Sequence, residues 1–332
     1  MPMPKLFQGK LALPVIASPM FIVSYPELVV AECKAGIVGT FPSLNARPIE
    51  LLDQWLGQVT EELAAYAAAN PDKPVAPFGV NLIVHKSNGR LMDDLALVVK
   101  HKVPLVITSV GAPTQIVEAV HSYGGLVFHD VTNVKHAKKA LEAGVDGLIL
   151  VCAGAGGHAG TLSPFALLPE VRAFFDGPIV LAGSMSSGAA IRAAEVMGAD
   201  FAYMGTRFIA TAEANASPAY KQMIVDGAAA DIVYTPSSAA SPATTWPTAS
   251  SPTASTPARS APPWASPTCP TGTTRPRRPG RTSGPPARAS APSMTCPPCR
   301  SWWTGWRRST APRPSGRCSA ELPLSPPGRG SG

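Results

Sequence analysis

The sequence predicts a single (β/α)8 barrel over residues 1–236, and two observations carry this prediction. Eight short apolar runs rich in Val, Ile and Leu recur along this part of the chain, separated by stretches with helical spacing of apolar residues. The runs are continuous rather than alternating, which is typical of parallel strands buried on both faces. Eight strands in about 240 residues match the size of this barrel, whereas a doubly wound sheet would need fewer strands or an obvious break. The expected strands are 14–20, 37–43, 77–82, 105–111, 126–131, 147–153, 178–184 and 201–208.

The expected helices lie between these strands. They include 48–69, 91–101, 133–143 and 186–197. In the third of them Val134 and Leu141 fall on one face and several lysines on another, as in an amphipathic helix. Gly36, Gly144 and Gly198 each precede a strand, so we expect them to end helices in the left-handed conformation that glycine adopts easily.

Charge is distributed unevenly along the chain. Residues 1–240 hold 16 Lys and Arg against 20 Asp and Glu, whereas residues 241–332 hold 12 Arg and a single acid, Glu321. The basic pI of about 9.2 therefore comes from the last quarter of the chain. The predicted barrel is mildly acidic, which argues against a basic face for nucleic acid.

Cysteine usage and hydropathy indicate a cytoplasmic protein. Only Cys33 and Cys152 lie in the predicted barrel, so no disulfide framework is expected and a reducing compartment fits. Cys296 and Cys299 form one C-x-x-C without a second half, so we expect no metal. We expect neither a signal peptide nor a membrane span, because no run of about 18 apolar residues occurs.

Residues 237–332 form a low-complexity segment rich in Pro, Ala, Ser and Arg. From residue 241 onward the segment lacks Ile, Val, Phe, Tyr, Asn, Gln, His, Lys and Asp, yet it contains five Trp. A native disordered tail is one explanation. We favour a reading-frame shift, because one permitted set of codons for 237–246 (SSAASPATTW), read one base back, gives FFSGVPGNYL. The same shift gives protein-like sequence around 287–299, so residues after 236 are not used to infer function.

Two glycine turns predict a phosphate site at the last two strands. Gly183 and Ser184 end the expected strand 178–184, and Gly205 and Thr206 lie near the end of the expected strand 201–208. In barrels of this kind the loops after strands seven and eight often bind phosphate through backbone N–H groups. Glycine lets the backbone approach an anion closely, and Thr206 adds a hydroxyl donor. The alternative is that both are ordinary turns.

The loop after the sixth strand carries the candidate catalytic residue. This loop reads AGAGGHAG over 153–160, with His158 directly after Gly156 and Gly157. Histidine is the side chain best suited to exchange a proton near neutral pH, and the barrel mouth places it over the site. Cys152 has no base placed to activate it and is interpreted as packing.

Residues at the ends of earlier strands are candidates for contact with the ring of a ligand. Ser18, Pro19 and Met20 end the first strand and offer an apolar shelf with backbone polar groups. Asn81 ends the third strand and can form hydrogen bonds. His129 and Asp130 are neighbours on the fifth strand. Side chains alternate between the two faces of a strand, so only one of the two points inward. His85 is a weaker candidate, and His101, His121 and His136 are expected on helix surfaces.

As a set, these motifs resemble the nitronate monooxygenase family, formerly called 2-nitropropane dioxygenases. The matching segments within residues 10–236 are PVIASPM, PFGVNL, AGAGGHAG, PIVLAGSM and MGTRFIATAEA, and the shifted reading of the tail also resembles the family's C-terminal region. The resemblance implies a barrel flavoprotein that binds FMN without a covalent bond and oxidises alkyl nitronates with O₂. It implies that His158 acts as a base toward a nitroalkane or assists the nitronate. It also implies that the cofactor is held by Gly156, Gly157, Gly183, Ser184, Gly205 and Thr206, with Ser18, Pro19, Met20, Asn81 and Asp130. Many members carry a lysine near the flavin where this chain has Asp130.

Three other functions remain as alternatives. A flavin-dependent enoyl-ACP reductase using NAD(P)H would share the barrel, the GGH loop and the GTRF segment. A non-catalytic flavin-binding module would bind FMN without turnover, and a nucleic-acid binder would act through the Arg- and Trp-containing tail. The expected partners are a small nitronate and O₂, without nucleic acid or membrane, and a homodimer is the assembly to test.

Overall fold

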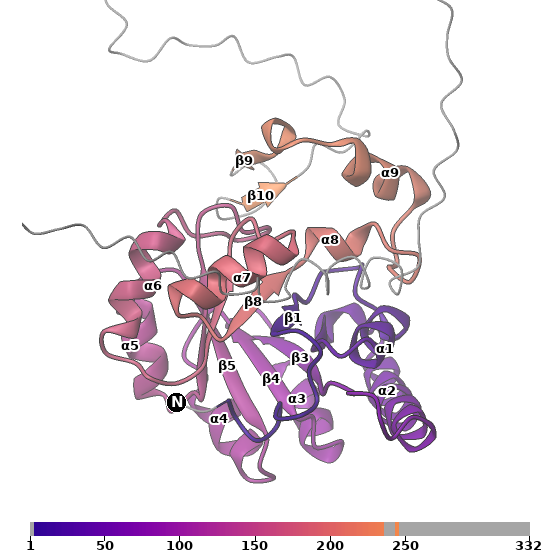
Figure 1. Cartoon of the computed structure of the whole chain (residues 1–332). Coiled ribbons are helices and arrows are strands. Elements are labelled where there is room, and N and C mark those ends of the chain that lie inside the picture. Colours follow the sequence, from indigo (N-terminus) through magenta and orange to yellow (C-terminus); the bar gives the residue numbers. More distant parts are fainter. Residues whose placement is uncertain (1–2, 236–242, 246–332) are drawn as a thin grey trace, which may run out of the picture.

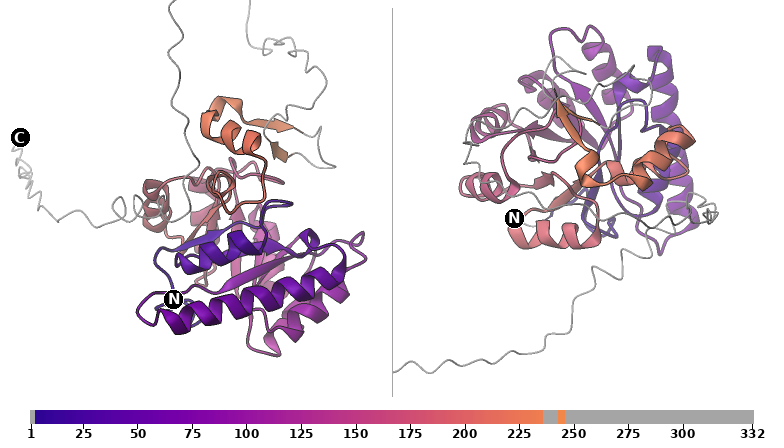
Figure 2. Two further views of the ribbon diagram at one scale, coloured as in Figure 1. Left: turned by 90° about the vertical axis from the view of Figure 1, so that its right-hand side faces the viewer. Right: turned by 90° about the horizontal axis from the view of Figure 1, so that it is seen from above.

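The computed structural model describes residues 3–235 and 243–245 and has the predicted barrel (Figure 1). Eight parallel strands follow one another in the order β1-β8-β7-β6-β5-β4-β3-β2. A parallel bridge between Ile16 and Val38 joins β1 to the start of β2 and closes the circle. Seen from above in Figure 2, the strands surround a central axis and helices lie outside them.

All eight predicted strands are confirmed, with small differences at their ends. The strands are β1 (Val15–Ala17), β2 (Gly39–Pro42), β3 (Phe78–Ile83), β4 (Leu105–Ser109), β5 (Leu126–Val131), β6 (Gly147–Val151), β7 (Ile179–Ala182) and β8 (Phe201–Met204). The helices between them are α1 (Pro26–Lys34), α2 (Ile49–Ala69), α3 (Leu91–Lys100), α4 (Thr114–His121), α5 (Val134–Glu142), α6 (Pro164–Arg172) and α7 (Gly188–Met197). Polar and glycine residues at the expected C-terminal strand ends fall in the loops, which is why several strands are shorter than the apolar runs.

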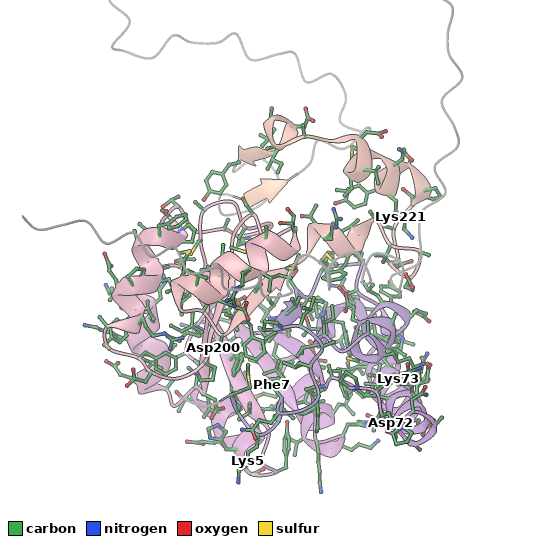
Figure 3. All side chains as sticks on the ribbon, in the orientation of Figure 1. Lys5, Phe7, Asp72, Lys73, Asp200 and Lys221 are labelled. Atoms are coloured by element: carbon green, nitrogen blue, oxygen red, sulfur yellow. The ribbon has the colours of Figure 1, made fainter. Side chains whose placement is uncertain are left out.

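Aromatic and aliphatic side chains fill the barrel interior. Phe7, labelled in Figure 3, comes from the segment before β1 and is buried with Phe128 and Phe201. The ring centroids of Phe7 and Phe201 are 5.0 Å apart, with the rings edge to face. Interior side chains of β1, β4, β6 and β7 complete this cluster. The interior is therefore a packed core, and a ligand site must lie at one of its ends.

The helices pack on the outside of the strands, and three of them end at the glycines that the sequence predicted. Gly36, Gly144 and Gly198 have φ values of 82°, 87° and 99°, so the three expected left-handed helix ends are confirmed. A larger cluster of buried aliphatic side chains, including Val59, Leu150 and Leu181, joins the helices to the outward faces of the strands. Strands β1 and β4 to β8 thus carry buried apolar side chains on both faces, as the continuous runs indicated, whereas β2 and β3 contribute such side chains to the outer cluster alone.

Three further segments follow β8. The short helix α8 (Thr206–Ile209) leads to α9 (Pro218–Asp226), and β9 (Val233–Thr235) pairs antiparallel with β10 (Ala243–Thr245). In Figure 1 these segments lie at the end of the barrel where the parallel strands terminate. Apart from β10, the interpretation of residues 237–332 as a shifted reading concerns a segment outside the described residues. Within the described residues, no helix is both long and apolar enough to cross a membrane.

Candidate functional site

The loops after β6 and β7 contact each other directly at the C-terminal end of the barrel. The backbone N–H of Ser184 donates to the carbonyl of Gly154 at 2.9 Å. A Cβ added to Gly183, which has a φ of 133°, would lie 2.7 Å from the carbonyl oxygen of Ala153, and one added to Gly154 would collide with the Ser184 side chain. Both glycines are therefore required for this close approach of the two loops. The Ser184 amide is engaged inside the protein, so a ligand at this turn would use other donors, such as the exposed Ser184 hydroxyl.

The turn after β8 packs against the loop after β1. A Cβ on Gly205 would collide with the Ser18 hydroxyl and lie 3.5 Å from the sulfur of Met20. The backbone N–H of Ser18 donates to the carbonyl of Met204 at 2.8 Å. Ser18, Pro19 and Met20 are half-buried, whereas Thr206, the first residue of α8, is exposed. The structure therefore brings the predicted ring shelf beside the predicted phosphate turn.

A buried asparagine holds the loop that contains Met20. Asn45, in the short helix Ser43–Asn45, accepts from the backbone N–H of Ile22 at 2.8 Å. Its amide nitrogen donates to the carbonyls of Met20 at 3.0 Å and Ser24 at 2.9 Å. The hydroxyl of Ser24 in turn accepts from the backbone N–H of Met20. The shape of this loop is thus fixed by side chains rather than by a strand or helix.

His158 lies on the glycine-rich loop with its side chain exposed. The loop is ordered from within, because the N–H of Ala153 donates to the carbonyl of Leu162 and the N–H of Gly160 donates to that of Val151. Gly156 and Gly157 are exposed, and an added Cβ at either would meet nothing within 4 Å. The hydroxyl of Tyr234, on β9, donates to the carbonyl of Ala159 at 3.2 Å. His158 is therefore exposed to solvent, on a loop that β9 contacts.

A chain of hydrogen bonds crosses three strands on the inner face of the mouth. The Asn81 amide donates to the Ser109 hydroxyl at 2.8 Å, and that hydroxyl donates to Oδ2 of Asp130 at 2.6 Å. The other carboxyl oxygen of Asp130, Oδ1, is buried and accepts no hydrogen bond from the described residues. Burial raises the pKa of Asp130 to about 6, although the hydrogen bond from Ser109 acts to lower it. A carboxyl group that titrates near neutral pH in a barrel mouth is typical of a functional site.

His129 and Asp130 point to opposite faces of β5, and Asp130 is the inward one. The His129 side chain is buried in the outer layer, where its Nδ1 lies 2.7 Å from the hydroxyl of Thr108. Burial, followed by the charge of His136, lowers the pKa of His129 to about 4, so it is neutral at physiological pH. It therefore serves packing rather than the site. His136 and His121 are exposed as expected, but His101 is half-buried and forms an ion pair with Asp53.

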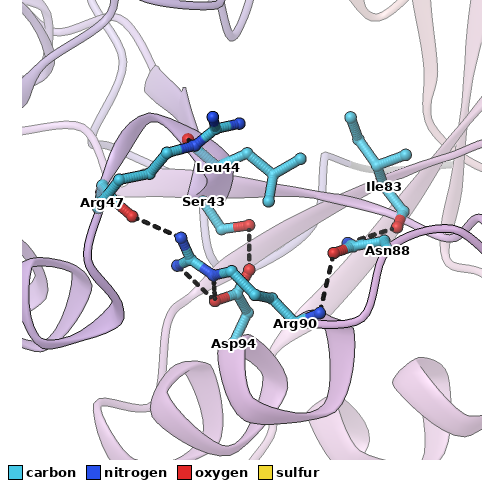
Figure 4. Close-up of polar contacts among 8 residues, drawn as sticks. Ser43, Leu44, Arg47, Ile83, Asn88, Arg90 and Asp94 are labelled. Carbon is cyan, nitrogen blue, oxygen red and sulfur yellow. Dashed lines mark hydrogen bonds and ion pairs between the residues drawn. The ribbon is translucent and has the colours of Figure 1, made fainter.

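A buried ion pair fixes the loops after β2 and β3 (Figure 4). Asp94 of α3 is fully buried and accepts two hydrogen bonds from the Arg90 guanidinium and one from the Ser43 hydroxyl. Arg90 also donates to the carbonyl of Ala46 at 2.7 Å. Asn88 donates to the carbonyl of Ile83, at the end of β3. These bonds hold the strand end that carries Asn81, and the sequence had not singled them out.

The mouth fits a ligand that combines an anionic group with a flat polar ring. Gly183 and Gly205 let the neighbouring loops pack closely, and Ser184 and Thr206 beside them are exposed residues with hydroxyl donors. Asp130 supplies a buried oxygen that lacks a partner among the described residues, which a ring with hydrogen-bonding edges would satisfy. FMN has both features. Tyr203 of β8 also belongs to this inner face, and its pKa is raised by burial and then by the charge of Asp130. Period-two alternation along β8 would have revealed Tyr203 in the sequence.

Comparison with known proteins gives a consistent family. The sequence model of the nitronate monooxygenase family matches residues 89–248, which include the glycine-rich loop and both glycine turns. A nitronate monooxygenase of Paraburkholderia phytofirmans is 26% identical and covers 67% of this chain and 70% of its own. A (3aS,4S,5R,7aS)-5-hydroxy-7a-methyl-1-oxo-octahydro-1H-indene-4-carboxyl-CoA dehydrogenase of Rhodococcus jostii is 29% identical, covering 63% of this chain and 55% of its own. The chain spans about half the length of the first curated relatives it matches.

Solved structures share the fold. A nitroalkane oxidase from Streptomyces ansochromogenes has a TM-score of 0.64 at 25% identity, covering 73% of this chain and 79% of its own. FabK from Thermotoga maritima has a TM-score of 0.62 at 28% identity, covering 71% of each chain. Both matches agree with the barrel described above.

Proposed function

We propose that the chain, which matches the sequence model of the nitronate monooxygenase family over residues 89–248, binds FMN at the barrel mouth and oxidises alkyl nitronates with O₂. The observation that carries this proposal is the family match over residues 89–248, since that range contains the loops after β4, β5, β6, β7 and β8. The nitroalkane oxidase with the same fold supports the same substrate class. When bound, FMN supplies the electron acceptor for the nitronate and the reductant for O₂.

Different residues would bind the phosphate and the ring of FMN. The turns at Gly183 and Gly205, with the Ser184 and Thr206 hydroxyls, would hold the phosphate by close backbone approach and hydrogen bonding. Ser18, Pro19 and Met20 would support the ring, and Asn81 and Asp130 would contact its polar edge. Gly156 and Gly157 would leave room above the ring for the substrate, because no described side chain fills the space beside them.

His158 would act as the base toward neutral nitroalkanes. The residue is exposed on the loop after β6, from which its imidazole would take the proton from the carbon beside the nitro group. A nitronate has already lost that proton, so its oxidation should not require the base. This difference separates the role of His158 in proton transfer from a role in binding.

Oxygen uptake by the FMN-loaded full chain tests the proposal. We expect uptake with a preformed nitronate, and His158→Asn should lower the rate with the neutral nitroalkane by about 100-fold or more while largely preserving the rate with the nitronate. His121→Asn, a change at an exposed histidine at the end of helix α4, serves as the control. Equal rates of His158→Asn and the parent chain with the neutral nitroalkane would show that His158 is not the base.

A thioester arm of the same assay tests the main alternative. FabK has a similar fold, and the Rhodococcus relative is a CoA-thioester dehydrogenase by name. NADH consumption with a crotonyl thioester, without oxygen uptake from a nitronate, would replace the proposed function by that of an enoyl reductase. Bound FMN without turnover in either arm would favour a flavin-binding module.

A further inference from the structure

Asp130 points into the barrel interior, on the same inner face as Tyr203 of β8. Its Oδ2 is bonded to Ser109 on the neighbouring strand β4. Its charge raises the pKa of Tyr203 on β8, and β6 and β7 separate β8 from β5 in the sheet. Both side chains therefore lie on the inner face of the barrel, near the C-terminal strand ends that form the mouth.

Only one of the two carboxyl oxygens of Asp130 accepts a hydrogen bond from the described residues. Ser109 accepts from Asn81 and donates to Asp130, so the hydroxyl hydrogen is committed to Oδ2. Oδ1 is buried and receives no hydrogen bond from the described residues. A buried carboxylate oxygen without a donor has lost its hydrogen bonds to water and has gained none in the protein. This loss favours either protonation of the carboxyl group or a hydrogen bond from a ligand.

The groups that face Asp130 do not neutralise its charge. From β3 and β4 they are the neutral Asn81 and Ser109, and from β8 the titratable group is Tyr203. The inward side chains of β6 and β7 are the aliphatic Ile149, Val151, Val180 and Ala182. Within the described part of the chain, no Lys, Arg or His forms an ion pair with Asp130. A negative charge arriving nearby would therefore act on Asp130 without an ion-pair partner from the described residues to offset it.

We propose that Asp130 takes up a proton from solvent when the flavin ring bound at this mouth is reduced and becomes negatively charged. The inference rests on the proposed binding of FMN. In the test described below, dithionite supplies two electrons to the ring. The ionised carboxylate then gains one proton in addition to any proton that the ring itself takes, because a second negative charge in this uncompensated interior is unfavourable. The neutral acid offers an O–H donor to the ring at the oxygen that has no partner in the described structure.

The pH range of this uptake follows from the buried carboxyl. The pKa of Asp130 is about 6 before reduction, and the negative ring raises it further. Above pH 6 the carboxylate is ionised with the oxidised ring and becomes protonated with the reduced ring, so the extra proton is taken up there. Below that range the carboxyl is already neutral and reduction takes up no extra proton at this residue.

Potentiometric titration of the FMN-loaded full chain from pH 5 to pH 9 tests the proposal. The slope of midpoint potential against pH counts the protons taken up per two electrons. We expect the parent chain to take up close to one more proton than Asp130→Asn over part of the range above pH 6, because asparagine cannot titrate. The ring's own proton is common to both and cancels in the comparison.

Two further variants separate this role from general disturbance of the site. Ser109→Ala removes the hydrogen bond that lowers the pKa of Asp130, so the extra uptake should persist and shift to higher pH. Glu142→Gln, a change of an exposed acid on the helix after β5, should leave the titration unchanged. Identical proton counts for the parent chain and Asp130→Asn, with FMN bound to both, would overturn the inference. Failure of the parent chain to bind FMN would instead overturn the proposed function.

Discussion

Gly183→Ala tests the claim that the loops after β6 and β7 must touch for the site to form. The new Cβ would lie 2.7 Å from the carbonyl oxygen of Ala153, closer than real contacts of this kind, so the two loops must separate by roughly half an ångström. The backbone φ of 133° is also one that residues with side chains rarely adopt. Strain of about 1–3 kcal/mol from the backbone and about 1–3 kcal/mol from the collision together predict a loss of about 2–6 kcal/mol.

This loss can be measured by thermal unfolding of the full chain and by FMN binding. For a domain of this size the loss corresponds to a fall in Tm of roughly 4–24 °C. The Kd for FMN, followed by quenching of flavin fluorescence, should rise by more than about tenfold, because the opened loops no longer present the phosphate turn.

Gly124→Ala is the matched control for this change. Gly124 also has a positive φ, 84°, but an added Cβ meets nothing within 4 Å, and the residue lies in the turn before β5 at the opposite end of the barrel. We expect a loss of about 1–2 kcal/mol and no change in FMN affinity. Equal effects of the two variants on FMN affinity would refute the reasoning.

The remaining predictions concern the stability of the flavin-free chain. Asp94→Ala leaves Arg90 without its buried partner and should cost about 3–5 kcal/mol in urea unfolding, whereas Glu62→Ala, in an exposed pair with Lys34, should cost about 1 kcal/mol or less. The pKa of Asp130 is raised from 3.8 to about 6, so the folded state holds more protons than the unfolded state between these values and stability falls as pH rises through them. Asp130→Asn should therefore be more stable than the parent chain by up to about 3 kcal/mol at pH 7, with the difference disappearing near pH 3.5; a difference independent of pH would contradict this.

The barrel was predictable because its strands are continuous apolar runs followed by helix-ending glycines. Period and composition decide such features locally. The turns at Gly183 and Gly205 were also predictable from residue type, since only glycine permits the close contacts seen there. Alternation along β5 did not decide whether His129 or Asp130 points into the barrel. The hydrogen bonds of the two residues show that Asp130 does.

Contacts between distant segments were not predictable in this way. Asn45 fixes the loop of Met20 across more than twenty residues, and its role depends on a side chain reaching three backbone groups at once. The bond between the Ser184 amide and Gly154 likewise depends on the packing of two loops. The shifted reading of residues 237–332 stays an interpretation, and sequencing the gene across codons 234–240 would decide it.

Comparing the affinity of the full chain for FMN and for riboflavin tests the central claim, that a phosphate is held at the turns after β7 and β8. The two ligands share the ring and differ in the phosphate, so the ratio of their Kd values isolates the phosphate contribution. Two charge-assisted hydrogen bonds contribute about 3 kcal/mol or more, which predicts that FMN binds about 100-fold more tightly. Equal affinity for the two flavins, or no binding of either, would contradict the account.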